Sequence, residues 1–183
     1  AASASDDMLA GVDRQRVELI VHGVLNAAGE PDAQIRITTA AEAPARSQWY
    51  GVRFAGTSEG STLSHAVIDH GVYGVVHESS GRLDLADLVI EQSGDCAVMV
   101  REGAGPFALT RATLAHSTTC GARTFGADVR VTSSVIWDNH TGLWSTLSGE
   151  GDELLFVNNT LQGGTLGVRV DKREEASTAR VIN

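Results

Sequence analysis

Three polar residues of the chain could take part in acid–base chemistry. His116 and Asp138 each follow an apolar segment of similar pattern, and His140 comes shortly after Asp138. Proton transfer needs a histidine or a carboxylate beside a positioned partner, and histidine together with aspartate can also ligate a metal. The alternative is a structural role, in which these side chains bind backbone groups of turns. We therefore treat His116, Asp138 and His140 as weak catalytic candidates, and we predict no metal site.

Two arginines and a tryptophan form a second group, Arg123, Trp144 and Arg169, which recurs at nearly regular intervals. If these intervals belong to a structural repeat, the three side chains stack on one outer face. A tryptophan flanked by guanidinium groups can hold a sugar ring that carries carboxylates or sulfates. In the alternative, Trp144 packs under a loop or against a neighbouring chain. These three residues are the candidate ligand-binding residues.

The two cysteines, Cys96 and Cys120, occupy equivalent positions of neighbouring repeats. Stacked parallel strands place equivalent Cα atoms about 4.8 Å apart, which is within the range that a disulfide allows. Reduced thiols also pack well, because cysteine behaves as a small hydrophobic residue. Two stacked, reduced thiols are our first expectation, and a disulfide between neighbouring rungs is the alternative. Two cysteines alone do not predict a metal site.

A sequence repeat of about 23 residues predicts the structural elements that position these candidate residues. Its opening, Tyr50-Gly51-Val52-Arg53-Phe54, returns as Tyr73-Gly74-Val75-Val76-His77. Three apolar columns recur, and their expected members are Val52, Val75, Val98, Ala122, Leu143 and Val168; Leu63, Leu85, Leu109, Val131 and Leu155; and Ile68, Ile90, Leu114, Ile136 and Thr160. Two residues after the first column comes another inward position, where His77 stands between Phe54 and Val100, so we expect a neutral, hydrogen-bonded core histidine there. Glu78 and Arg101 should form a surface pair between rungs.

Short alternating segments of this kind predict strands and leave no room for pairs of helices. We therefore predict an all-β, single-domain parallel β-helix of about six to seven rungs, in which stacked rungs share one core. The expected division is a lead-in or cap over residues 1–15, repeats over 16–170, and an end or cap over 171–183.

One stretch carries a more specific resemblance. The segment Trp49-Tyr50-Gly51-Val52-Arg53-Phe54 is preceded by Gly23-x-Leu25-x-Ala27-x-Gly29 and by Ile35-x-Ile37-Thr38. Together they resemble the right-handed parallel β-helix repeats of the pectate-lyase-like superfamily, particularly its branch in large secreted or surface bacterial proteins. The resemblance covers residues 16–170, and it implies an extracellular or cell-surface location. The superfamily includes polysaccharide lyases, hydrolases, esterases, epimerases, phage tailspikes and adhesins.

The signatures of the superfamily's best-known enzymes are missing. Its lyases hold calcium with acidic residues on one strand face, whereas the expected outer face here carries no acid and consists of Arg53, Val76, Met99, Arg123, Trp144 and Arg169. The Gly-His-Gly and Arg-x-Lys signatures of its hydrolases and the Asp-Pro-His motif of its epimerases are absent too. We therefore lean towards a protein that is not an enzyme and expect no cofactor, with calcium open but unsupported.

The net charge of −9 argues against nucleic acid as a partner, because phosphate binding needs a basic face. No apolar run approaches the roughly 18–20 residues of a membrane span. The sequence begins at Ala1 without a signal peptide or a starting methionine, so we expect a processed protein or an excised segment of a larger chain.

Three functions stay open. The leading one is a non-catalytic binding or structural module of a secreted or surface protein, which contacts carbohydrate or another protein surface. The second is a polysaccharide lyase or glycoside hydrolase that acts on an acidic glycan. The third is an architectural spacer within a larger chain.

Overall fold

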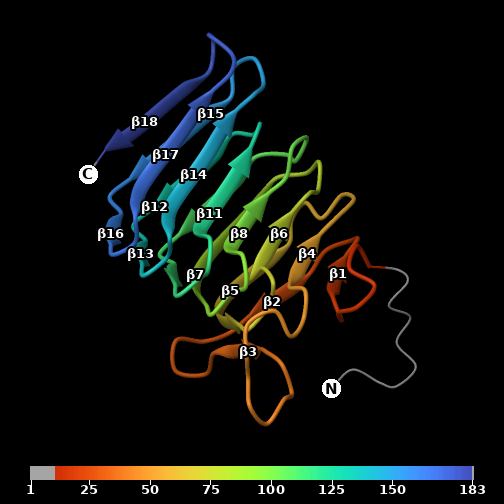
Figure 1. Cartoon of the computed structure of the whole chain (residues 1–183). Helices are drawn as coiled ribbons and strands as arrows, with labels where there is room; N and C mark the ends of the chain where they lie inside the picture. The colour runs from red at the N-terminus through yellow and green to blue at the C-terminus, as the bar shows by residue number, and fades with distance from the viewer. Residues whose placement is uncertain (1–10, 183) are drawn as a thin grey trace.

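The strands of the chain coil into a parallel β-solenoid of about five turns. The computed structural model describes residues 11–182, and this part of the chain contains strands and no helix. Figure 1 shows the successive turns stacked along the molecule from the N-terminal to the C-terminal end, so that equivalent strands of neighbouring turns lie side by side. The predicted all-β parallel β-helix is confirmed. No helix among the described residues is long and apolar enough to cross a membrane.

One wall of the solenoid is a sheet of seven parallel strands, here called sheet A. Its strands, in spatial order, are β1 (Leu19–Val21), β4 (Val52–Phe54), β6 (Val75–His77), β8 (Cys96–Val100), β11 (Cys120–Phe125), β14 (Thr141–Leu147) and β17 (Leu166–Lys172). The register pairs all six residues of the first predicted column, from Val52 to Val168. Leu19 of β1 adds a further member, which the repeat pattern did not include.

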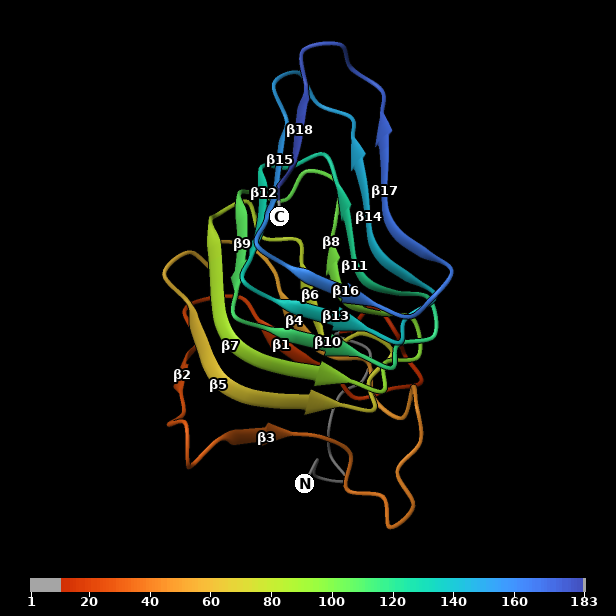
Figure 2. The same cartoon turned by 90° about the vertical axis from the view of Figure 1, so that its left-hand side faces the viewer.

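The other two walls belong to one sheet of eleven strands, here called sheet B. Its strands are β2 (Asn26–Ala28), β3 (Ile35–Ile37), β5 (Thr62–Asp69), β7 (Leu83–Glu91), β9 (Phe107–Thr110), β10 (Thr113–Ala115), β12 (Val129–Thr132), β13 (Val135–Trp137), β15 (Glu153–Val157), β16 (Thr160–Gln162) and β18 (Thr178–Ile182). In Figure 2, β9, β12 and β15 form one wall and β10, β13 and β16 form the base that leads back to sheet A. Strands β5 and β7 continue through the bend between these walls.

Each turn bends at residues with left-handed backbone angles. The bend within sheet B uses His65, Asp87, Arg111, Ser133 and Asn158, whose φ angles lie between 47° and 57°. The bend towards sheet A uses His70, Gln92, His116 and Asp138, with φ between 52° and 61°. Side chains rarely adopt this conformation, and Asn, Asp and His are among those that tolerate it best. The polar residues after each apolar column are therefore first of all corner residues.

The core is one continuous stack of apolar side chains enclosed by both sheets. Phe54, Leu109, Leu114 and Leu143 are examples that lose almost all contact with solvent. Burying a side chain of this size stabilises the fold by roughly 1.5–3 kcal/mol. Near the corner the space is so tight that a side chain at Gly74 would collide with Ile90. The glycines that recur in sheet A therefore mark a close approach between two walls.

Two predicted columns slip by one residue in their last member. Phe156 pairs with Val131, and Leu161 pairs with Ile136, in place of the expected Leu155 and Thr160. The slip follows the longer turn over residues 148–152, between β14 and β15. Because β15 contains the apolar run from Leu154 to Val157, alternation alone could not fix which side chains point inwards.

The solenoid has about five turns, fewer than the six to seven rungs predicted. At the N-terminal end, β1, β2 and β3 have only three residues each, and the last described turn ends in β18 without a third strand. The last described turn is therefore incomplete, whereas the first has all three strands. Of the predicted lead-in over residues 1–15, residues 1–10 lie outside the described part. Strand β17 extends beyond residue 170, and β18 adds a further strand to sheet B within residues 171–183.

Candidate functional site

The outer face of sheet A brings the three predicted ligand-binding residues together. Arg123 in β11 pairs with Trp144 in β14, and Trp144 pairs with Arg169 in β17. All three alternate with residues that face the core, so their side chains project outwards from successive strands. Regular stacking of the turns is what places them in one row.

The two guanidinium groups cover the indole ring of Trp144. The Cζ atom of Arg123 lies 3.9 Å from the ring centroid, and that of Arg169 lies 4.3 Å from it. Because β11 and β17 flank β14 on opposite sides, the two cations approach the ring from opposite sides. Trp144 also donates a hydrogen bond of 2.9 Å from Nε1 to Oδ2 of Asp171. The indole thus offers no free face on which a sugar ring could stack, and its role is to hold two cations in place.

The two arginines differ in their other partners. Arg169 donates from Nε to both carboxylate oxygens of Asp171, at 3.2 and 3.1 Å. The hydrogen bond from Trp144 and the one from Arg169 lower the pKa of Asp171 below its usual value. Arg123 lies over Phe125 as well, with Cζ 4.7 Å from that ring centroid. No acidic residue among residues 11–182 forms an ion pair with Arg123, and its buried Nε has no hydrogen-bond partner there.

Two of the three weak catalytic candidates are in contact. Nδ1 of His116 lies 2.8 Å from Oδ2 of Asp138, across neighbouring turns. The imidazole also packs edge-on against Trp137, with ring centroids 4.2 Å apart. His140 instead has its Nδ1 3.3 Å from Oγ1 of Thr165. The structure therefore contains a histidine–carboxylate pair at an exposed corner, and His140 has a different partner.

The structure gives no metal cluster in the part of the chain that it describes. Within residues 11–182, no group of three or more His, Cys, Asp or Glu side chains could hold a metal ion. At the corner beside β5, the buried carboxylate of Asp69 contacts Arg36, Thr38 and His70. These contacts tie β3 and β5 together, and they lower the pKa of Asp69 despite the opposing effect of its burial.

A disulfide joins Cys96 in β8 to Cys120 in β11, with Cα atoms 4.4 Å apart. Of the two expected states, the structure has the bridge and not the reduced thiols. Both cysteines are fully buried in a small apolar cluster that is separate from the main core and also contains Tyr50, Tyr73 and Met99. Met99 of this cluster pairs with Arg123 in the neighbouring turn, and Cys120 lies in the same strand as Arg123. The bridge therefore ties β11, the first strand of the arginine row, to the preceding strand β8.

The predicted pair between Glu78 and Arg101 is wrong. Glu78 pairs with Arg53, which also donates from Nε to Oε2 of Glu18 at 2.9 Å. Arg101 donates from Nη2 to the hydroxyl of Tyr50 at 3.3 Å. Glu18 precedes the first clear repeat, so its side chain could not be assigned to a column. Glu78 and Arg101 follow the paired residues His77 and Val100 on neighbouring turns, which is why they were the predicted pair, whereas the structure places Glu78 against Arg53 of the preceding turn.

The predicted core histidine is confirmed. His77 is fully buried, and its Nε2 lies 3.0 Å from the carbonyl oxygen of Gly105. Its Nδ1 is buried without a hydrogen-bond partner among the described residues. Burial lowers the pKa of His77, because a charged imidazolium would lose its hydration inside the solenoid. The side chain is therefore a neutral part of the core.

No family model, no curated protein and no solved structure matches this chain. What the structure supports of the resemblance is the parallel β-solenoid itself. The function has to be argued from the chemistry of the surface.

Proposed function

We propose that this protein is a non-catalytic binding module of a secreted or cell-surface protein, of the pectate-lyase-like type, and that sheet A contacts an acidic carbohydrate. The observation that carries the proposal is the state of Arg123. Its guanidinium is held over Trp144 and Phe125 and has no acidic partner among residues 11–182.

A guanidinium in this state suits a ligand anion. Arginine binds a carboxylate or a sulfate through two parallel hydrogen bonds, and such charge-assisted bonds are stronger than neutral ones. Stacking against two rings restricts the side chain before the ligand arrives, so less conformational entropy is lost on binding. Trp144 supports the proposal by positioning the cation and needs no contact with the sugar.

The spacing of the arginines favours a polymer with repeated acidic groups. The backbones of Arg123 and Arg169 lie two strands apart in sheet A, which corresponds to about 10 Å, and their two guanidinium groups approach each other at the Trp144 ring, with Cζ 3.9 and 4.3 Å from its centroid. Arg169 is partly neutralised by Asp171, so we assign the stronger contact to Arg123 and a weaker one to Arg169. A polysaccharide that carries uronic acids or sulfate esters has the required pattern.

The test is titration calorimetry with polygalacturonate, alginate and chondroitin sulfate, with a neutral galactan as the reference. We expect the acidic polymers to bind and Arg123→Gln to weaken them about 10- to 100-fold, the loss expected for hydrogen bonds to a charged group. Arg130→Gln is the matched control, because Arg130 is an exposed arginine of sheet B. Equal binding by the Arg123 and Arg130 variants would contradict the proposal.

Trp144→Ala separates the positioning role from direct contact. This variant keeps both arginines but removes the ring between them, so binding should weaken by a factor similar to that of Arg123→Gln. If Trp144→Ala also lost affinity for a neutral galactan that the natural protein binds, the tryptophan would itself contact sugar.

The contact between His116 and Asp138 supports a second candidate, a lyase or hydrolase acting on the same class of polymer. Incubation of the protein with polygalacturonate, followed by assays for new reducing ends and for unsaturated products, tests it. Product formation that is lost in His116→Gln would replace the binding module with an enzyme.

A further inference from the structure

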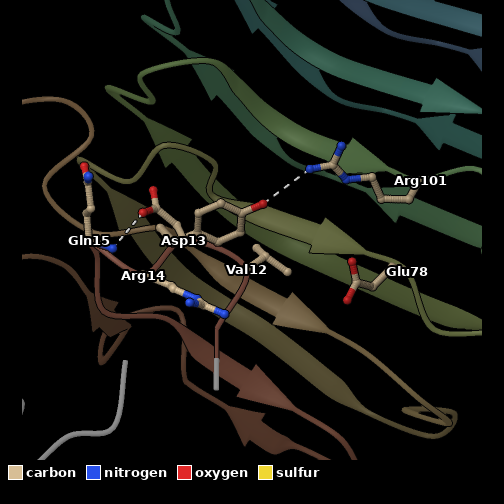
Figure 3. A pocket seen from close by; sticks show the side chains of 7 residues that line it. Val12, Asp13, Arg14, Gln15, Glu78 and Arg101 are labelled. Atoms are coloured by element: carbon tan, nitrogen blue, oxygen red, sulfur yellow. Dashed lines mark hydrogen bonds between the residues drawn. The ribbon is translucent and has the colours of Figure 1, made fainter. Parts of the chain in front are cut away.

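An open pocket lies between the described N-terminal segment and the beginning of the sheet A face. Residues 12–15 supply one side, and Tyr50, Glu78 and Arg101 supply the other. Its volume is about 570 Å³, which falls within the range of small-molecule sites. Figure 3 shows that Arg14 and Arg101 come from these two different segments. The pocket is separate from the arginine row around Trp144.

The acids of the pocket are already engaged within the protein. Oδ1 of Asp13 accepts a hydrogen bond of 2.9 Å from the backbone of Gln15, and its Oδ2 pairs with Arg16. Oε1 of Glu78 pairs with Arg53, which leaves Oε2 as an acceptor for a ligand hydroxyl. The charge of Asp13 is thus compensated, whereas Glu78 shares Arg53 with Glu18 and is compensated only in part.

The cations of the pocket are not compensated in this way. No acid among the described residues forms an ion pair with Arg101, whose one hydrogen bond goes to the neutral hydroxyl of Tyr50. The guanidinium also lies 5.7 Å from the ring centroid of Tyr73, which orients it. Arg14, at the other side, is exposed and has no ion-pair partner in the described part of the chain. Arg14 and Arg101 together outweigh the part of the Glu78 charge that Arg53 does not compensate, so the pocket presents a small net positive charge.

The hydroxyl of Tyr50 is a second donor at the same place. Tyr50 is only 6% exposed, and its hydroxyl accepts from Arg101 but has no acceptor of its own among the described residues. Tyr73 provides the contrast, because its hydroxyl donates to Oδ2 of Asp95 at 2.9 Å. Burial raises the pKa of Tyr50, so the phenol keeps its proton at neutral pH and can donate it.

We propose that this pocket binds a single acidic sugar unit, whose carboxylate or sulfate accepts hydrogen bonds from Arg101 and from the hydroxyl of Tyr50. The two donors converge on one place, and one of them, Arg101, is a cation without an ion-pair partner among the described residues. Together they form a site for one anionic group. Val12 offers an apolar contact for the ring, and Oε2 of Glu78 accepts from a ring hydroxyl. The unit is a free sugar acid or the end of a chain. The site shares its ligand chemistry with the proposed function but does not need Arg123.

The experiment is an NMR titration of the full chain with D-galacturonate and D-glucuronate, followed at the amides of Gln15 and Glu78. Galactose and glucose are the neutral references. We expect saturable shifts with the acids alone. Tyr50→Phe should weaken binding about tenfold, since one hydrogen bond to a charged group is lost, and Arg101→Gln should abolish it. Tyr73→Phe is the matched control, because it removes an equally buried hydroxyl that has its acceptor.

Two results would overturn the proposal: shifts of equal size with galactose, or the same affinity for Tyr50→Phe as for Tyr73→Phe. A tri-galacturonate that binds more tightly than the monomer identifies a chain end, and equal affinity identifies the free acid. Failure of this site is distinguishable from failure of the proposed function. Arg123→Gln should weaken polymers and leave the monomer titration unchanged, whereas Tyr50→Phe should weaken the monomer.

Discussion

At the scale of single residues, the surroundings of a side chain change the function that its type suggests. Trp144 looks like a surface for sugar stacking in the sequence, but its ring lies between two guanidinium groups. Arg123 is the residue left with unused binding capacity. The register of the strands, and with it the row, could be predicted from the repeat. Which groups cover the Trp144 ring could not be predicted, because this depends on side-chain conformations and on Asp171, which lies two residues beyond Arg169.

His77 should make the protein sensitive to acid. Its pKa in the folded state is lowered by burial, so below about pH 6.5, the usual value for histidine, the unfolded chain takes up a proton that the folded chain does not. Stability is therefore fully present above this pH and falls as the pH decreases, by at most about 1.4 kcal/mol per pH unit.

Urea unfolding between pH 7.5 and 5 measures this effect. In His77→Phe, which carries no titrating group at this position, the loss of stability over this range should be smaller than in the natural protein. Val75→Ala is the control, since it removes buried volume in the same strand without a proton. It should lower stability by a similar amount at every pH. If the unfolding free energy of His77→Phe fell with decreasing pH as steeply as that of the natural protein, other groups would be the cause of the decrease.

At the scale of elements, the corners are as important as the strands. Ser133 is an exposed corner residue with a φ of 53°. Ser133→Val should destabilise the protein by about 1–2 kcal/mol, because a β-branched side chain is strained in the left-handed region. Ser133→Gly should be neutral or slightly stabilising, because glycine adopts this conformation without strain. Thermal unfolding of the two variants compares them at one position, and equal effects would rule out backbone strain as the cause.

The bridge between β8 and β11 is the second element-scale test. It links residues 24 apart in the sequence, and closing a loop of that length should stabilise the fold by about 3 kcal/mol. The double variant Cys96→Ala and Cys120→Ala should unfold at lower denaturant concentration, both with and without a reducing agent. The natural protein should approach it only after complete reduction. A variant as stable as the oxidised protein would mean that packing in the cluster is sufficient.

The elements also show where prediction from sequence stops. The repeat predicted the whole first column of sheet A and the parallel stacking. The repeat predicted the wrong residue after the turn at residues 148–152. The longer connection shifts the strand by one residue, and because β15 is an apolar run, alternation does not show which of its side chains face the core. The repeat also did not place Leu19 of β1 in the first column, because the segment before Tyr50 lacks the repeat's motif and could not be aligned by spacing. Side-chain ion pairs such as Glu18 with Arg53 could not be assigned for the same reason.

At the scale of the whole molecule, the turns depend on one another. A turn alone cannot bury its apolar face, and each gains its core only from the turns on either side. The walls are nevertheless specialised. Sheet A carries the disulfide, the aromatic cluster and the arginine row, whereas the bends of sheet B carry the corner residues. The outward residues of sheet A can therefore differ from turn to turn, because the inward columns supply the core that stabilises the fold.

The arginine row belongs to a molecule with a net charge of −9, and this has a consequence for how fast an anionic ligand arrives. At low ionic strength the field of the whole chain repels a polyanion over the Debye length of about 30 Å, whereas near 0.15 M salt that length shrinks to about 8 Å. Short contacts at Arg123 are screened much less. For the proposed ligand, the association rate should therefore rise with added salt up to about 0.15 M, and stopped-flow mixing with an acidic oligosaccharide measures it. A rate that falls over this range would indicate attraction by a local basic field that outweighs the charge of the chain.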